Sequence, residues 1–153
     1  MMPPIRILFV CHGNICRSPM AQCVMQNLVN ERNLTNQFVI DSAATTTEEL
    51  GNPMYPPARR ELERHGVPVV AHRARQITRQ DGDTWDYIVF MDAENERHLR
   101  RILGAHPRAQ VLPLMSFAGS TRDVADPWYT GDFASTYQDV LAGCTAFLDQ
   151  LAG

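Results

Sequence analysis

The 153-residue chain has the size of one domain, and its 44% hydrophobic and 20% charged residues suit an ordinary apolar core, so we expect a single domain over residues 1–153. The net charge is −3 and every basic side chain is arginine, so the strongly basic composition of a nucleic-acid-binding protein is absent. No apolar run is long enough to cross a bilayer, and the first residues do not resemble a signal peptide. We therefore expect a cytoplasmic monomer without a membrane segment.

Short apolar runs with β-branched and aromatic residues predict four buried strands, at residues 5–10, 38–42, 87–91 and 110–114. Helical patterns lie between and after these runs. The first helix is expected to follow Ser18 as its N-cap, with Pro19 as the first helical residue. Three more are expected, from about residue 57 to 65 before Gly66, after Asp92 as N-cap, and along an apolar stripe from Tyr137 to Leu151.

The alternation of strands and helices predicts an α/β fold class. Parallel strands need a crossover connection, which is usually a helix, and the crossovers place helices on both faces of the sheet. In such open sheets, ligands bind at the carboxyl ends of the strands. The residues directly after each predicted strand are therefore the first place to look for chemistry.

The loop after the first strand reads Cys-His-Gly-Asn-Ile-Cys-Arg-Ser-Pro over residues 11–19, and a helix is expected to follow it. Backbone N–H groups of such a loop, together with the free amides and positive end of the helix, can surround a phosphate dianion. Gly13 and Asn14 are residue types that tolerate the positive φ of a tight loop. The segment therefore predicts an anion-binding loop.

Three side chains of this loop suit nucleophilic catalysis. Arg17 carries a planar fork that can hold two phosphoryl oxygens at once. Cys11 would lie beneath the phosphorus, and the dipoles that bind phosphate would also stabilise its thiolate as the nucleophile. The hydroxyl of Ser18 can donate to the same sulfur. We interpret the loop as catalytic rather than as a pair of inert buried cysteines.

The segment Val-Cys-x-Gly-Asn-Ile-Cys-Arg-Ser-Pro resembles the phosphate-binding loop of the low-molecular-weight protein tyrosine phosphatases. Further blocks of the chain resemble that family in the same order, at residues 41–45, 51–53, 72–76, 91–95 and 126–129. The resemblance implies a flavodoxin-like three-layer sandwich whose four-stranded parallel sheet has the order 2-1-3-4. It also implies a cysteinyl-phosphate intermediate, no metal or other cofactor, phosphotyrosine-bearing proteins as partners, and phosphate, vanadate or sulfate as active-site anions.

The phenolate of an aryl phosphate must be protonated as it leaves, and Asp126 is the candidate acid. Because Asp126 precedes a proline, it is biased toward an extended conformation that suits projection from a loop. By resemblance, Asp126 protonates the leaving oxygen and then deprotonates the attacking water, while Trp128 and Tyr129 wall the groove for the substrate ring. Glu48 lies where many eukaryotic relatives have an aromatic residue, and with Glu49 it is expected to favour basic residues beside the phosphotyrosine.

The resemblance also assigns supporting roles around the loop. Further phosphate-binding and loop-support residues are His12, Gly13, Asn14, Ile15, Cys16, Ser18, Ser42 and His72. Asn14, Ser42 and His72 are expected to form the hydrogen-bond network that holds the loop open. Cys16 is also expected to form a redox pair with Cys11, capturing an oxidised nucleophile as a disulfide.

Two alternatives remain open at this point. Protein-arginine phosphatases resemble this chain as well, but they carry a threonine where it has Ile15, so Ile15 favours phosphotyrosine over phosphoarginine. The other is a catalytically silent phosphotyrosine-binding module, which would keep Arg17 but lose Cys11 or Asp126. Both residues are present.

Overall fold

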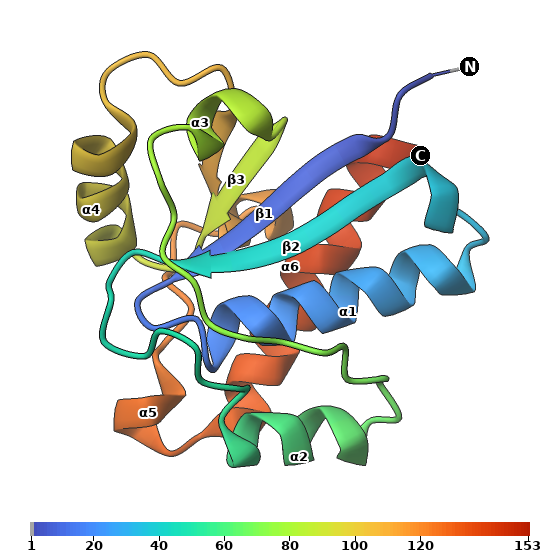
Figure 1. Cartoon of the computed structure of the whole chain (residues 1–153). Helices are drawn as coiled ribbons and strands as arrows, with labels where there is room; N and C mark the ends of the chain where they lie inside the picture. The colour runs from blue at the N-terminus through green and yellow to red at the C-terminus, as the bar shows by residue number, and fades with distance from the viewer. Residues whose placement is uncertain (1) are drawn as a thin grey trace.

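The computed structural model describes residues 2–153 (Figure 1). Its strands are β1 (Ile5–Cys11), β2 (Phe38–Ala44), β3 (Tyr87–Phe90) and β4 (Gln110–Pro113). They form one parallel sheet in the order β2-β1-β3-β4, as predicted. The α-helices are α1 (Arg17–Glu31), α2 (Pro56–Arg64), α3 (Asp81–Thr84), α4 (Ala93–Leu103), α5 (Pro127–Thr130) and α6 (Phe133–Ala152). Two short 3₁₀ helices are η1 (Thr35–Gln37) and η2 (Leu114–Ala118).

Strand β1 lies in the middle of the sheet and is buried on both faces. Side chains alternate along a strand, so Ile7 and Phe9 enter one apolar core while Leu8 and Val10 enter the other. All four are fully buried. This two-sided burial explains why the strand reads as a continuous apolar run rather than as an alternation of polar and apolar residues.

Helices cover both faces, which makes the three-layer architecture that the sequence predicts. Helices α1, α2 and α6 contribute to the core on the Phe9 side, and α4 contributes Leu99 and Leu103 to the core on the Val10 side. Figure 1 shows α1 and α6 together on one side of the sheet and α4 on the other. Within residues 2–153, no helix is both long and apolar enough to span a membrane.

Most predicted boundaries agree with the structure. Asp92 is the N-cap of α4, and its carboxylate accepts a hydrogen bond from the Asn95 N–H at 2.8 Å while the Asn95 side chain accepts from the Asp92 N–H. Gly66, just beyond α2, has a φ of +71°, which suits the residue that ends a helix. The short helices α3 and α5 have four residues each and were not predicted.

The predicted start of the first helix is wrong. Helix α1 begins at Arg17, with Cys16 in the N-cap position, so Ser18 and Pro19 lie inside the first turn. The Ser18 side chain cannot cap the helix because it points at the Cys11 sulfur instead, with its hydroxyl oxygen 3.0 Å from Sγ. No side chain caps α1, and among the described residues the Arg17 amide in its first turn has no acceptor.

Candidate active site

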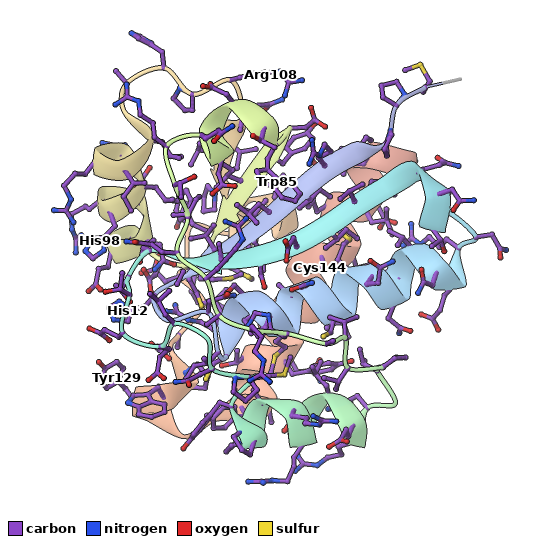
Figure 2. All side chains as sticks on the ribbon, viewed as in Figure 1. His12, Trp85, His98, Arg108, Tyr129 and Cys144 are labelled. Carbon is purple, nitrogen blue, oxygen red and sulfur yellow. The ribbon has the colours of Figure 1, made fainter. Side chains whose placement is uncertain are left out.

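A pocket opens at the carboxyl end of β1, where the loop of residues 12–16 leads into α1. Its lining joins segments that are far apart in the sequence: Cys11, His12, Gly13, Ile15, Cys16, Arg17, Glu48, Glu49, Asp126, Trp128 and Tyr129. Figure 2 shows His12 and Tyr129 at this end of the molecule, near the tips of the strand arrows. The structure thus gathers at one pocket the nucleophile, arginine, acid and groove residues that the sequence predicts.

The floor of the pocket has the character of an anion cradle. Among residues 2–153, no protein atom accepts a hydrogen bond from the backbone amides of Gly13, Ile15, Cys16 or Arg17. Free amides in one loop, together with the uncapped N-terminus of a 15-residue helix, attract a dianion. The loop therefore has the free donors that the predicted anion-binding site requires.

The Cys11 sulfur lies at the centre of this cradle and is 3% exposed as a residue. It accepts hydrogen bonds from the Asn14 N–H at 3.3 Å and the Ser18 N–H at 3.4 Å, and the Ser18 hydroxyl lies 3.0 Å away. Three hydrogen-bond donors thus converge on one sulfur atom. This arrangement suits a nucleophile and also a leaving group.

Arg17 is buried, and its guanidinium is held from one side. Nη1 donates to the Asp92 carboxylate at 2.6 Å and to the Val124 carbonyl at 2.9 Å. Burial opposes the charge of Arg17, but the negative charges of Cys11, Asp92 and Asp126 outweigh it and raise the pKa of the guanidinium. Arg17 therefore stays cationic, and its orientation is set by Asp92 and Val124, which lie outside the loop of residues 12–16.

Asp126 lies across the pocket from the phosphate loop, in the extended conformation that its proline neighbour predicts. Its Oδ1 accepts a hydrogen bond from the Trp128 N–H at 3.0 Å, which makes it the N-cap of α5. Its Oδ2 lies 3.4 Å from Arg17 Nη2. The Asp126 carboxylate thus lies beside Arg17, and both residues line the same pocket.

Asn14 connects the loop of residues 12–16 to the structure behind it. Its φ of +61° is in the left-handed region, as expected for this loop, whereas Gly13 does not have a positive φ and that part of the prediction is wrong. The Asn14 amide donates to the hydroxyls of Ser18 at 2.9 Å and Ser42 at 3.0 Å. Ser42 in turn donates to Gln22 on α1 at 2.6 Å. These contacts tie the loop to both β2 and α1.

A second set of contacts reaches the loop from the segment of residues 72–81. His72 Nε2 donates to the Asn14 carbonyl at 2.6 Å, and burial lowers the pKa of His72, so the ring is neutral at pH 7. The Arg75 N–H donates to the Asn14 side-chain oxygen at 3.2 Å. The Arg75 guanidinium is bound by both oxygens of Asp81 within the same segment, and the Arg75 carbonyl accepts from the Ala44 N–H of β2 at 2.7 Å, which ties the segment to the sheet. Ser42 and His72 therefore lie behind the loop and not in the pocket.

Cys16 is buried near Cys11. Burial raises the pKa of its thiol strongly, and the nearby charges of Cys11 and Asp126 add to the effect. Ile15 packs with Cys16 and Ala74 in a small apolar cluster and also lines the pocket. A thiol of this kind stays protonated and has little reactivity of its own.

Aromatic side chains form the outer wall of the pocket. Trp128 is 52% exposed and packs against Tyr55 with ring centroids 4.9 Å apart, while Tyr129 is 83% exposed. Both Trp128 and Tyr129 line the pocket, as predicted. Tyr55 was not predicted, since it precedes α2 in a segment without a recognisable motif.

Polar side chains line the opposite rim. Glu48, which the sequence places at the substrate groove, accepts a hydrogen bond from His12 Nε2 at 2.9 Å. His12 Nδ1 lies 3.3 Å from a carboxylate oxygen of Glu94 on α4, a residue that the sequence analysis missed. The contact of Asp92 with Arg17 was missed as well, although its position directly after β3 was a usable signal.

Comparisons with known proteins agree with this geometry. A profile of the family described as low molecular weight phosphotyrosine protein phosphatase matches residues 6–153. The protein of that name from Pongo abelii is 39% identical over 94% of each chain, and the low molecular weight protein-tyrosine-phosphatase YfkJ from Bacillus subtilis is 38% identical over 94% of each chain.

Solved structures are similar over nearly the whole chain. The crystal structure of YfkJ has a TM-score of 0.92 at 37% identity and covers 97% of this chain and 94% of its own. The crystal structure of DARP, a Drosophila arginine phosphatase, has a TM-score of 0.86 at 32% identity and covers 96% of this chain and 98% of its own. On the family match and these relatives, the chain belongs to the low molecular weight phosphotyrosine protein phosphatase family.

Proposed function

We propose that this protein hydrolyses phosphotyrosine in proteins through a cysteinyl-phosphate intermediate, with Cys11 as nucleophile, Arg17 as phosphate-binding residue and Asp126 as general acid and base. The observation that carries the proposal is the convergence of a donor-surrounded sulfur, free loop amides, a buried arginine and a carboxylate on one pocket. The family of the chain adds to its support.

In the first step, the Cys11 thiolate attacks the phosphorus while the bond from phosphorus to the phenolic oxygen breaks. The protonated carboxyl of Asp126 gives its proton to the departing oxygen. The free amides of the loop and the Nε and Nη2 edge of Arg17 receive the three non-bridging oxygens. Asp92 and Val124 bind Nη1, whereas among the described residues Nη2 has only the 3.4 Å contact with Asp126, which the phosphate oxygens would replace.

In the second step, water attacks the phosphorus of the cysteinyl phosphate, and the bond between sulfur and phosphorus breaks. Asp126, now ionised, accepts the proton of the water. The electron pair returns to the Cys11 sulfur, where the Ser18 hydroxyl and the two backbone amides stabilise the thiolate as it leaves. Inorganic phosphate then departs, and vanadate and sulfate are expected to compete for the same cradle.

The proposal is tested by measuring hydrolysis of a phosphotyrosine peptide by the reduced protein, in the presence of a chelator and at mildly acidic pH. Turnover is expected to vanish in Cys11→Ser and to fall sharply in Asp126→Asn, because the first lacks the nucleophile and the second the acid. Rapid quenching of the parent is expected to trap phosphate on Cys11. Undiminished turnover in Cys11→Ser would refute the mechanism.

Phosphoarginine is the second candidate substrate, because the arginine phosphatase DARP is similar in structure to this chain. The apolar Ile15 in the pocket lining suits an aromatic ring better than a guanidinium. Assays of matched phosphotyrosine and phosphoarginine peptides decide between the two substrates. Binding of both peptides without turnover would instead indicate a phosphotyrosine-binding module.

A further inference from the structure

His12 links two carboxylates at the pocket rim. It follows Cys11 directly, yet its ring reaches Glu48 in the loop after β2 and Glu94 in the first turn of α4. The distances are 2.9 Å from Nε2 to Glu48 and 3.3 Å from Nδ1 to Glu94. The two ring nitrogens thus face two different carboxylates, and His12 joins the loop after β2 to the start of α4.

The backbone near Glu48 is fixed to the same loop. The Thr46 N–H and hydroxyl both donate to the His12 carbonyl, at 3.2 and 3.0 Å, and the Thr46 hydroxyl accepts from the Glu48 N–H at 3.4 Å. Glu48 is therefore held at its backbone by Thr46 and at its carboxylate by His12. An exposed glutamate would otherwise sample many rotamers, and fixing it in advance lowers the entropy cost of meeting a ligand.

The fixed carboxylate remains accessible and lies beside the pocket. The Glu48 side chain is 66% exposed and lines the pocket together with His12. Glu48 and Glu94 place two carboxylates around one imidazole, so this cluster is negative for either charge of the ring, and Glu49 adds a further carboxylate to the pocket lining. The rim is thus negative, whereas the floor, with Arg17 and the free amides, is suited to an anion.

We propose that His12 is a positioning residue that fixes Glu48 at the pocket entrance, where Glu48 selects phosphotyrosine peptides with arginine or lysine next to the phosphotyrosine. This rests on the proposed function and adds the sequence context of the substrate. The loop of residues 12–16 orients the phosphotyrosine, and Glu48 contacts the residue next to it in the peptide. A neighbouring glutamate meets repulsion at the same place.

The test uses two peptides that differ only in arginine or glutamate on both sides of the phosphotyrosine. At low salt, kcat/KM of the parent is expected to favour the arginine peptide by about three- to tenfold, the range for one or two exposed ion pairs, and the preference should shrink at high salt. Glu48→Gln is expected to lower this ratio toward one. Glu63→Gln, which removes an exposed carboxylate on α2, is the matched control and should keep the parental ratio.

His12→Leu separates positioning from simple charge. If only net charge mattered, His12→Leu would leave the preference for arginine unchanged or raise it. If His12 positions Glu48, the preference falls instead, because the released glutamate loses its fixed place. A ratio that stays the same or rises in His12→Leu, or a parental ratio near one, would overturn the inference.

Free phosphotyrosine and a binding measurement keep this test independent of the proposed function. If the parent hydrolyses neither the peptides nor free phosphotyrosine, the proposed function fails. Affinities of the two peptides for Cys11→Ser, measured by fluorescence anisotropy, then still report the selection by Glu48. Hydrolysis of free phosphotyrosine without a preference between the two peptides would agree with the proposed function and refute only the role of His12 and Glu48.

Discussion

Replacing Asp92 by asparagine removes the charge that orients Arg17 and leaves the helix cap in place. Asn is as good an N-cap as Asp, so the contact with the Asn95 N–H is retained. The 2.6 Å ion pair with Arg17 is lost, and Arg17 is only 2% exposed. Breaking a buried pair outright costs about 3–5 kcal/mol. Because the new amide oxygen and the Val124 carbonyl still accept from Nη1, we expect a loss of about 2 kcal/mol in the free energy of unfolding.

The same change is expected to lower catalysis more than its effect on stability suggests. A guanidinium freed from Asp92 no longer presents a fixed edge to the phosphate, and a misplacement of this kind costs roughly 100-fold in rate. Urea unfolding gives the stability, and kcat/KM on an aryl phosphate gives the activity.

Asp132→Asn is the matched control for this experiment. Asp132 caps α6 through the Ser135 N–H, but it has no arginine partner among the described residues. We expect Asp132→Asn to leave kcat/KM unchanged. If Asp92→Asn also stays within about twofold of the parent in kcat/KM, the reasoning about Arg17 is refuted.

Three further predictions follow from the loop and its supports. Peroxide should convert Cys11 to a sulfenic acid, which condenses with the Cys16 thiol to a disulfide and water. Dithiothreitol should then restore the activity of the parent but not that of Cys16→Ser. Equal recovery of both activities would exclude the redox pair. Asn14→Ala should lower the free energy of unfolding by about 2–4 kcal/mol, because it removes three side-chain hydrogen bonds and places alanine at a positive φ. Asn14→Gly removes the same hydrogen bonds without this strain, so its loss should be about 1 kcal/mol smaller. Equal urea midpoints of the two variants would contradict this reasoning. Burial opposes the charge of Asp81, but hydrogen bonds, chiefly from Arg75, lower the pKa of its carboxyl. The ionised carboxylate therefore stabilises the fold above its unfolded pKa of about 3.9, and this contribution is lost as pH falls through the lower folded pKa. Asp81→Asn should therefore be less stable than the parent at neutral pH and lose less on acidification, as urea unfolding across this range can check.

The sheet and the main contents of the pocket were predictable because they depend on local patterns. A strand buried on both faces leaves a continuous apolar run, and a loop that surrounds an anion needs a narrow choice of residues. Cys11, Arg17 and Asp126 therefore line the same pocket in the structure as the sequence predicts. Their catalytic roles, and those of the supporting residues, stay predictions.

Other features left little or no trace in the sequence. A backbone carbonyl such as that of Val124 can be supplied by almost any residue type, so its contact with Arg17 has no sequence signature. The partnership of His12 with Glu94 depends on how α4 sits against the phosphate loop, which only the folded chain determines. Helices of one turn, such as α3 and α5, are too short to show a period. The start of α1 was predicted too late because serine is a common N-cap residue, whereas the Ser18 hydroxyl contacts the Cys11 sulfur.

The anchoring of Arg17 has a consequence for how the protein becomes active as it is synthesised. Cys11 and Arg17 leave the ribosome early, whereas Val124 and Asp126 are synthesised more than a hundred residues later. The central place of β1 also requires β3 before the sheet can close on both sides. A nascent or truncated chain thus holds a cysteine without a seated arginine or an acid. Phosphatase activity should appear only when the last part of the chain has folded, so prematurely terminated products are inert toward phosphoproteins.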